Sequence, residues 1–496
     1  MKKLFILLAL LPMLSIASAQ DLEFLEQEIK GLDQASSAHA TFLGKRDGLT
    51  LLITNRSASN RSELGSGIML FGINEKGKVE KSLEISKLRE CILVTCTAVG
   101  DTAYMIACGA IKGHDFDFYR LKVDIASWTV VGSPELVYEH KNTKADWTDW
   151  AIATSPDGHV RAISIKVVNE QSRIAKAFGK KDEESDVLLV TDDKLQTIWQ
   201  HDDLPSWYSS LTIDNEECVH AILAGVNGDK TYLLFANHNS YGDETFMDSV
   251  NRSDIMSIQL INHVDGHFIA GGTIGEDHSA MRNTEYTGIY ALTYNTKSSK
   301  LTFNPQTLNN TERTALKNVS RMLGDELQGL TVKEGVPTPF GGILQCYTTM
   351  LHIYYTNGTP YYIYQMGGSL IAAIDTNANF VWKTPIRNSI SSSGTPVLLN
   401  QQVLYRNGKT YIVQTESAKN PATYSSTERI TALTQMPPTK SMLAIYAIDD
   451  NGAVTKQTLP LKKTLFFTGK VHNLNGDFFI TVGQLKKVRM IHIKGF

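Results

Sequence analysis

The hydrophobic and polar positions along the chain repeat one pattern: an apolar strand, a short turn rich in Asp and Asn, and a second strand that often carries Trp. The clearest copy covers residues 370–386 (LIAAIDTNANFVWKTPI). Further copies cover residues 67–79, 187–199, 287–303 and 442–455. Hairpins that recur roughly every 45–70 residues are typical of small sheets repeated radially around an axis.

A second recurring pattern places a turn of Gly, Asp or Asn immediately before a longer apolar strand. Its copies lie at residues 46–48, 100–101, 156–158, 214–215, 265–266, 407–408 and 475–476. These residues tolerate positive φ, which suits tight hairpin turns. The segments 147–163 and 207–222 are also alike, with a leading Trp, an acidic turn and a closing Ala-Ile. The pattern predicts an all-β chain: a single β-propeller of seven or eight four-stranded blades, with short helical decorations.

The amino-terminal residues 1–19 have the pattern of a secretory signal peptide. Lys2 and Lys3 precede an apolar run over residues 4–16, and Ala17-Ser18-Ala19 provides small residues for cleavage. The apolar run is shorter than the roughly 20 residues that span a bilayer. We therefore expect cleavage after Ala19 and a secreted or periplasmic protein with no membrane span.

Residues 20–38 form a separate amino-terminal segment, and residues 39–496 the propeller. Leu22, Leu25, Ile29 and Leu32 recur at helical spacing, which predicts a short helix in the first segment. A second helix-compatible stretch covers residues 311–327. An open sheet edge invites association, so we also expect the amino terminus or its first strand to pair with the last unit and close the ring.

Long polar inserts mostly fall at one phase of the repeat, between its second and third strands. They cover residues 56–66, 169–185, 275–285 and 417–440. Loops at one phase of a radial repeat emerge on one face, which is often the binding face. Growth of surface loops without a function explains the same inserts, because loop extension costs little.

Charge and cysteine content exclude several classes of protein. Loss of the leader removes two of the 48 basic side chains and none of the 51 acidic ones, so the formal net charge moves from −3 to −5. Such a surface gives no electrostatic case for binding nucleic acid. Five cysteines cannot all pair; Cys91 and Cys108 flank a predicted hairpin and form either a disulfide or two small buried side chains.

Two motifs resemble β-propeller families. The stretch over residues 370–386 is similar to the repeat of quinoprotein-like propellers, in which an Ala-x-Asp turn precedes a docking Trp, here Trp382. The sequence Ser155-Pro156-Asp157-Gly158 resembles the turn of propellers related to TolB and to the amino-terminal domain of prolyl peptidases. The adjacent cysteines of quinone-dependent dehydrogenases and the G-x-S-x-G elbow of a peptidase are absent from the sequence. The resemblance therefore implies a propeller fold and a non-catalytic relative.

The candidate binding residues lie where the chain enters two of the predicted units. Asp146, Trp147, Asp149 and Trp150 precede one strand, and Trp207 with Tyr208 holds the equivalent position in the next unit. Aromatic faces stack on sugar rings or peptides, and carboxylates bind hydroxyls or amines. The alternative is that each Trp packs between neighbouring blades.

Other chemistry-bearing groups give weaker patterns. Residues 351–364 (LHIYYTNGTPYYIY) predict a hairpin with Tyr354 opposite Tyr361, which packing between blades explains. Three loops mix metal-capable groups without a demanding spacing: residues 114–117, 263–267 and 276–278. The sequence predicts no catalytic residue, no metal site and no cofactor.

Two functions follow from these observations. The first is an exported, non-catalytic and monomeric propeller that recognises a protein partner or a glycan through one loop-rich face. The second is a secreted polysaccharide hydrolase or lyase with an acid and a base among carboxylates near the central channel.

Overall fold

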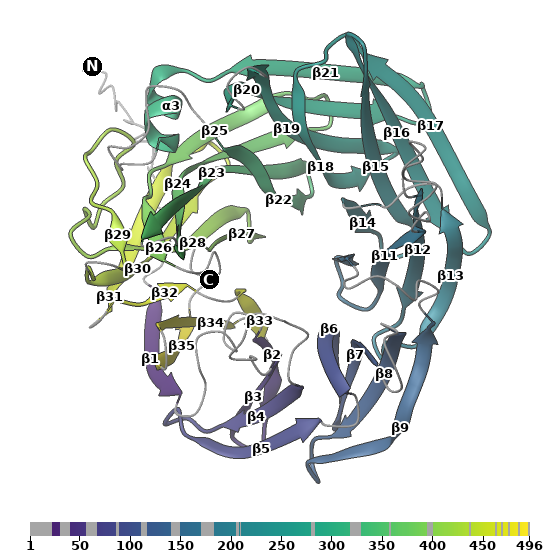
Figure 1. Cartoon of the computed structure of the whole chain (residues 1–496), viewed down its shortest axis with the longest axis vertical. Helices are drawn as coiled ribbons and strands as arrows, with labels where there is room; N and C mark the ends of the chain where they lie inside the picture. Colours follow the sequence, from purple (N-terminus) through teal and green to yellow (C-terminus); the bar gives the residue numbers. More distant parts are fainter. Residues whose placement is uncertain are drawn as a thin grey trace, which may run out of the picture.

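The computed structural model describes the chain in segments. They are residues 22–29, 40–55, 67–85, 89–110, 117–139, 149–169, 183–204, 208, 210–278, 283–317, 329–356, 359–393, 400–435, 438–461, 464–467, 470–474, 477–484 and 487–494. Eight sheets are arranged around a common centre, as Figure 1 shows. The predicted all-β propeller is therefore confirmed, and the number of blades is eight. We number the blades in chain order.

The first four blades are four consecutive strands each. Blade 1 contains β2 (Thr41–Arg46), β3 (Leu49–Asn55), β4 (Ile68–Ile73) and β5 (Val79–Ile85). Blade 2 contains β6 (Arg89–Val99), β7 (Thr102–Ala110), β8 (Asp117–Asp124) and β9 (Thr129–Tyr138). Blade 3 contains β10 (Trp150–Thr154), β11 (Arg161–Asn169), β12 (Glu183–Thr191) and β13 (Thr197–Leu204). Blade 4 contains β14 (Leu211–Ile213), β15 (Val219–Asn227), β16 (Lys230–Asn239) and β17 (Gly242–Val250).

The second half repeats the plan with additions. Blade 5 contains β18 (Ile255–Val264), β19 (His267–His278), β20 (Asn283–Asn295) and β21 (Lys300–Thr307). Blade 6 contains β22 (Leu330–Thr338), β23 (Gly341–Thr356), β24 (Thr359–Asp375) and β25 (Phe380–Ile386), with β26 (Ile390–Ser393) and β29 (Leu433–Thr434) added. Blade 7 contains β27 (Gln401–Arg406), β28 (Lys409–Ser417), β30 (Ser441–Ile448) and β31 (Val454–Pro460). Blade 8 contains β32 (Phe466–Phe467), β33 (His472–Leu474), β34 (Asp477–Gln484) and β35 (Lys487–Lys494).

Strand β1 (Glu23–Ile29) closes the ring as the outermost strand of blade 8. It pairs antiparallel with β35 over its whole length, from Glu23↔Lys494 to Ile29↔Val488. The predicted pairing of the amino-terminal segment with the last unit is confirmed. Over the described residues 22–29 a strand stands in place of the predicted short helix, because the open edge of β35 supplies backbone partners that a local periodicity does not reveal.

The core of the ring consists of separate apolar clusters, each between two consecutive blades. Eight large clusters account for the eight interfaces, and the one between blades 8 and 1 joins Ile29 and Phe479 to Phe42 and Leu52. Trp382 of blade 6 lies in one of them, and a Cβ added at Gly452 of blade 7 would lie 2.9 Å from its Cβ atom. The docking role that the resemblance implied for Trp382 is thus the packing of one blade on the next.

The predicted turns owe their sequence to backbone geometry. In the turns at Asp47-Gly48, Asp265-Gly266 and Asn407-Gly408 both residues have positive φ. In a second kind of turn, the side chain of an Asp or Asn accepts the N–H groups two and four residues ahead. Asp375 accepts from Asn377 and Asn379, both at 2.8 Å, and Asn74, Asp192, Asp214 and Asp449 do the same. The recurring Asp and Asn of the sequence therefore fix the hairpins.

All four predicted inserts lie between the second and third strands of their blades: β3 and β4, β11 and β12, β19 and β20, and β28 and β30. In the third of them, residues 275–278 and 283–285 are the paired ends of β19 and β20. These connections leave one end of the sheets, and the tight turns lie at the other, because consecutive strands of a blade are antiparallel. The second predicted helix is present in part as α3 (Asn310–Leu316), capped by Asn309. No helix in the described segments is long and apolar enough to cross a membrane.

Candidate functional site

The predicted binding residues divide between the described and the undescribed parts of the chain. Asp146, Trp147 and Trp207 lie outside the described residues. Asp149 is exposed, and its backbone carbonyl accepts the N–H of Lys166 at 2.9 Å. Trp150 is half-buried on β10, and its ring meets that of Phe118 in blade 2 edge to face at 6.0 Å. Trp150 therefore contributes to packing between blades.

Tyr208 differs from the expectation of an exposed binding residue, because it is 1% exposed. Its backbone N–H donates to Oδ2 of Asp186 at 3.1 Å, and its ring lies 5.2 Å from that of His238 between centroids. Burial raises the pKa of its hydroxyl to about 12, and the nearby Asp186 and Asp243 add to this effect. Its ring is part of the core between blades 3 and 4.

Asp186 itself is a buried carboxyl group in that core. Burial raises its pKa to about 7, although the Ser164 hydroxyl, which donates at 2.6 Å, and the Tyr208 N–H favour the charged form. The folded pKa lies above the ordinary value of 3.8, so the native protein binds more protons than the unfolded chain between about pH 4 and 7. Its contribution to stability must decline as pH rises through that window.

We expect Asp186→Asn to stabilise the protein at pH 8 by up to about 4 kcal/mol, since each pKa unit corresponds to roughly 1.4 kcal/mol. At pH 4 the two proteins should differ by less than about 1 kcal/mol, because the carboxyl group is then protonated in the fold. Urea unfolding across this pH range measures the difference, with Asp229→Asn in an exposed turn as control. Parallel pH profiles for Asp186→Asn and the unmodified protein would contradict this account.

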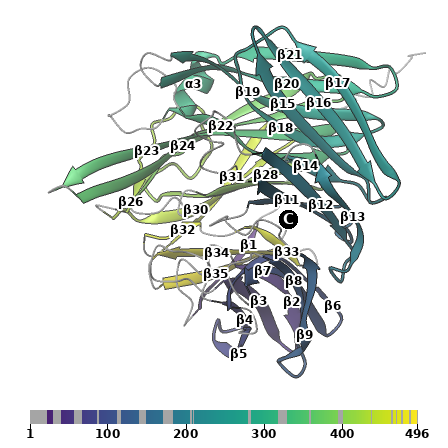
Figure 2. The ribbon, with the colours of Figure 1, turned by 45° about the vertical axis from the view of Figure 1, so that its right-hand side comes forward.

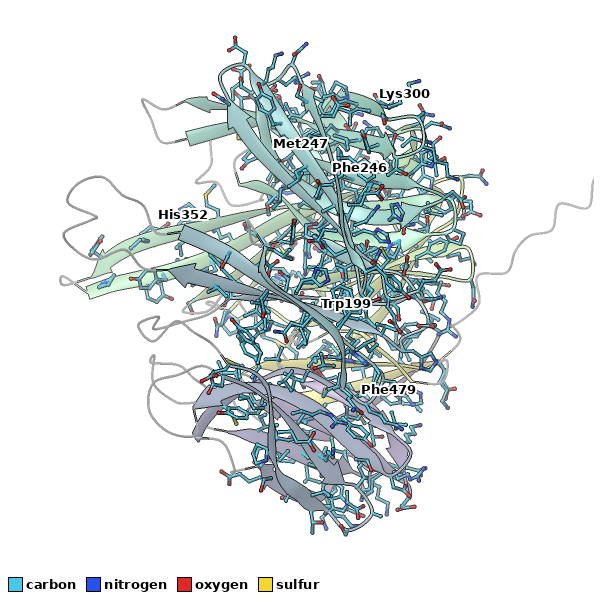
Figure 3. The ribbon with its side chains drawn as sticks, turned by 90° about the vertical axis from the view of Figure 1, so that its right-hand side faces the viewer. Trp199, Phe246, Met247, Lys300, His352 and Phe479 are labelled. Atoms are coloured by element: carbon cyan, nitrogen blue, oxygen red, sulfur yellow. The ribbon has the colours of Figure 1, made fainter. Side chains whose placement is uncertain are left out.

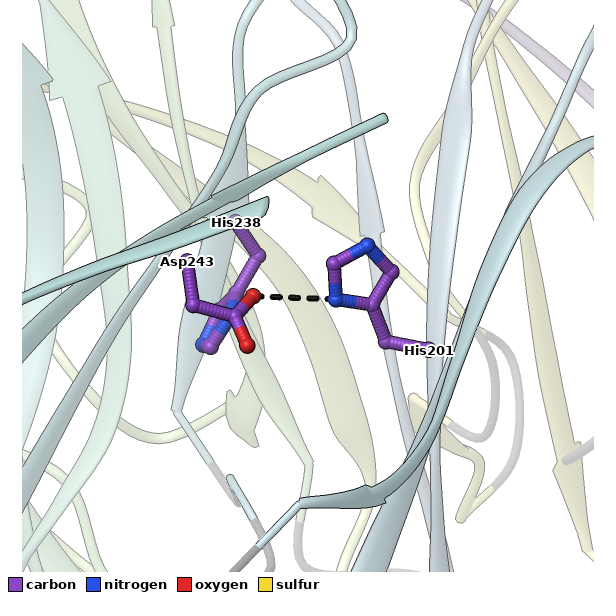
Figure 4. A group of neighbouring side chains, drawn as sticks. All are labelled: His201, His238 and Asp243. Carbon is purple, nitrogen blue, oxygen red and sulfur yellow. Dashed lines mark hydrogen bonds and ion pairs between the residues drawn. The ribbon is translucent and has the colours of Figure 1, made fainter. Parts of the chain in front are cut away.

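A cluster of three side chains lies beside Tyr208, at the boundary between blades 3 and 4. Asp243 Oδ1 lies 2.6 Å from Nδ1 of His238 and 2.9 Å from Nδ1 of His201, as Figure 4 shows for the three residues together. His201 belongs to β13, whereas His238 and Asp243 are a cross-strand pair on β16 and β17. We call these three residues the His–Asp cluster.

The electrostatics of the His–Asp cluster favour neutral imidazole at its buried end. His238 is 1% exposed, and burial lowers its pKa below the ordinary value despite the opposing effect of Asp243. The side chains of His201 and Asp243 are 18% and 38% exposed, so the cluster reaches solvent on one side. Its ligand atoms all lie within 4.8 Å of one another, which makes it a candidate metal centre.

A second group, Asp214, Cys218 and His220, also places three metal-capable atoms within 4.8 Å. Its atoms already have partners. Asp214 Oδ1 accepts the N–H groups of Glu216 and Cys218, and His220 contacts Asn237 at 2.8 Å and Asp214 at 3.3 Å through its two ring nitrogens. These hydrogen bonds hold the turn over residues 214–218 together and join it to His220 of β15.

The loops that the sequence suggested as metal-capable do not form such clusters in the described residues. His263 stacks on His220 at 3.7 Å, and burial lowers the pKa of His263 to about 3. His267 contacts Asn295 at 2.7 Å, residues 114–116 lie outside the described chain, and Glu276 is exposed. The cysteines are all free thiols, so Cys91 and Cys108 are buried side chains and not a disulfide.

Sequence reasoning missed the His–Asp cluster because its members are far apart in the chain and come from two blades. One signal was available: His238 and Asp243 flank the tight turn over residues 239–242, which makes them direct cross-strand neighbours. The position of His201 depends on how blade 3 packs on blade 4, which no local pattern encodes.

No family model and no curated protein sequence matches the chain. Solved structures resemble it weakly. The polysaccharide lyase Uly1 is 10% identical, with a TM-score of 0.34, covering 81% of this chain and 90% of its own. The Dos1 propeller is 7% identical, with a TM-score of 0.33 and coverage of 94% and 95%. A member of the DUF4221 family from Bacteroides vulgatus is 9% identical, with a TM-score of 0.28 and coverage of 96% and 98%. The chain itself is an eight-bladed β-propeller on the evidence of its own sheets.

Proposed function

We propose that the protein is an exported, non-catalytic β-propeller that binds a partner protein through a projecting β-hairpin on its loop-rich face. The hairpin is formed by residues 349–356 of β23 and 359–366 of β24, which we call the arm. It extends to one side of the ring in Figures 2 and 3, and His352 is labelled on it in Figure 3. The arm connects the second and third strands of blade 6, which is the phase of the long inserts.

The observation that carries the proposal is the exposed apolar surface of the arm. Leu351, Ile353 and Tyr355 alternate along β23 and are 47%, 49% and 74% exposed. The sequence contains no Asp, Glu, Lys or Arg between Glu334 and Asp375, although 20% of the chain is charged. Exposed strands are usually protected by charged side chains. An uncharged and exposed hairpin is therefore a candidate interaction surface.

The backbone of the arm favours a protein over a glycan. In the described residues, β22 pairs with β23 only as far as Leu330↔Thr348, followed by one further bond from the Thr349 N–H to the carbonyl of Gly329. No described strand pairs with the remainder of this edge of β23, so its outward backbone groups can bind another extended chain. The cross-strand pair Tyr354↔Tyr361 is present as the sequence predicted. The packing between blades expected for the hairpin does not account for Tyr355, which is 74% exposed.

The distribution of carboxylates gives less support to a polysaccharide hydrolase or lyase. Among the innermost strands whose side chains the structure describes, only β22 carries a carboxylate, at Glu334. An acid and a base acting on one glycosidic bond lie about 5–9.5 Å apart.

The test is capture of partners from an extract of the exporting cell with purified mature protein. We expect a defined protein partner, and we expect the triple substitution Leu351→Lys, Ile353→Lys and Tyr355→Lys to reduce its recovery at least tenfold. The control is Tyr241→Lys with Met247→Lys in blade 4, whose native side chains are 99% and 72% exposed.

The mature protein should begin at Gln20, which amino-terminal sequencing of the exported protein determines.

Two results would contradict the proposal. Equal recovery by the arm variant and the control variant would show that the arm is not the contact. If the protein bound a glycan array and captured no protein, its ligand would be a carbohydrate and not a partner protein.

A further inference from the structure

We propose that His201, His238 and Asp243 form a three-ligand site for a divalent transition-metal ion of the zinc class, which links blade 3 to blade 4. The inference is independent of the arm and of the partner that the arm binds.

The distances within the His–Asp cluster suit such an ion. Zinc binds imidazole nitrogen and carboxylate oxygen at about 2.0–2.2 Å, which places tetrahedral ligand atoms about 3.3–3.5 Å from one another. In the cluster, Asp243 Oδ1 lies 2.6 Å and 2.9 Å from the two Nδ1 atoms. Outward shifts of less than about 1 Å in these contacts bring them to the required separation.

The backbone holds two of the ligands firmly and leaves the third adjustable. His238 and Asp243 are paired directly across β16 and β17, so their side chains share one face of blade 4. His201 approaches from β13 of the neighbouring blade, where its side chain is 18% exposed. One blade thus supplies a fixed pair of ligands, and the other supplies a ligand able to close on the ion.

The donor set selects a class of ion. Two imidazoles and one carboxylate suit zinc, cobalt or nickel, whereas Mg²⁺ and Ca²⁺ prefer sites built from oxygen alone. Sites with three protein ligands usually complete the coordination with water. The exposed side of Asp243 gives water access to this fourth position.

Without an ion, hydrogen bonds hold the cluster together. Because a carboxylate oxygen only accepts, both Nδ1 atoms must then carry protons and donate to the single oxygen Oδ1. With an ion, both Nδ1 atoms are unprotonated ligands and each imidazole carries its proton on Nε2. Nε2 of His238 is buried without a hydrogen-bond partner among the described residues in either form, so this nitrogen does not distinguish the two. In the Asp214, Cys218 and His220 group, the two ring nitrogens of His220 face acceptor oxygens, Asn237 Oδ1 at 2.8 Å and Asp214 Oδ2 at 3.3 Å.

The experiment uses mature protein without a histidine tag, stripped with a chelator and titrated with Co²⁺ and Zn²⁺. We expect one equivalent of metal and visible cobalt bands of a nitrogen–oxygen site, with no thiolate-to-cobalt charge-transfer band. The melting temperature should rise on addition of Zn²⁺, because an ion that binds only the folded state stabilises it.

Variants assign the ion to its ligands. His201→Gln, at the more exposed ligand, should weaken Co²⁺ binding more than about 100-fold, since even outer partners of a metal ligand contribute 10–100-fold. Asp243→Asn should act in the same way, and both variants should keep the circular dichroism of the folded protein. Cys218→Ala in the second group should leave stoichiometry and affinity unchanged.

Absence of cobalt bands and of any Zn²⁺ shift in melting temperature would overturn the proposal. A charge-transfer band that disappears in Cys218→Ala would move the metal to the other group and would equally overturn it. If folded His201→Gln bound Co²⁺ with unchanged affinity, His201 would not be a ligand and the ion would not link blade 3 to blade 4.

Discussion

Replacing Lys456 by methionine is expected to destabilise the protein by about 3–5 kcal/mol, the usual cost of removing one partner from a buried ion pair. Lys456 Nζ lies 3.0 Å from Glu416 Oε2, and the two side chains are 3% and 1% exposed. The ammonium group also donates to the carbonyl of Pro421 at 2.7 Å. Without it, the carboxyl group of Glu416 is left without its cationic partner in a site with little access to water.

The surroundings of Glu416 are already organised around its charge. Gln414 donates to Oε1 at 3.1 Å and Asn420 to Oε2 at 3.2 Å, and the hydroxyl of Tyr446 donates to Oε1 as well. Burial raises the pKa of Tyr446 well above its usual range, and Glu416 adds to this effect. These groups cannot turn away easily, because they are themselves buried in blade 7.

Urea unfolding of Lys456→Met, Glu416→Gln and the double variant measures the pair. The double variant should lose less stability than the sum of the single ones, because no uncompensated charge remains. Lys122→Met is the matched control, since Lys122 pairs with Glu135 at 2.6 Å where the side chains are 32% and 49% exposed. Exposed pairs contribute only about 0–1 kcal/mol. Equal costs for Lys456→Met and Lys122→Met would refute the buried-pair account.

Replacing Ile29 by aspartate is expected to cost more than about 3 kcal/mol, because it removes a buried side chain and buries a charge instead. Ile29 is 2% exposed and lies in the apolar cluster between blades 8 and 1, opposite Val488 in the register. This cluster is the interface at which the two ends of the chain close the ring.

Leu25→Asp on the same strand is the control, since Leu25 is 39% exposed and lies opposite His492. It should change the melting temperature by no more than a few degrees, within the roughly ±0.5 kcal/mol of ordinary surface substitutions. Limited proteolysis should release the first strand from Ile29→Asp before the rest of the chain is cut. Similar stability of the two variants would mean that β1 does not hold the ring closed.

The features that sequence predicted well are those whose causes are local. Asp375 fixes its hairpin through N–H groups two and four residues ahead, and Asp47 with Gly48 fixes another through positive φ. Such turns recur in register with apolar strands, so the repeat, the phase of the inserts and the propeller follow from the sequence.

The features that it predicted poorly depend on contacts between distant segments. Leu22, Leu25 and Ile29 share a face at helical spacing, but pairing with β35 makes the segment a strand and leaves Leu25 exposed. Tyr208 is drawn into the core between blades 3 and 4, and His201 meets Asp243 only through the packing of those blades. For the Tyr-rich hairpin, the cross-strand pairing was predictable, whereas its projection from the ring was not.

The most direct test of binding through the arm is photo-crosslinking in the intact exporting cell, with p-benzoylphenylalanine placed at position 355 or at position 241. Both native tyrosines are exposed, at 74% and 99%, but they lie at opposite ends of the blades. We predict one discrete protein adduct from position 355 that Ile353→Lys abolishes, and no such adduct from position 241. The same adducts from both positions, or none from position 355, would contradict the proposed function.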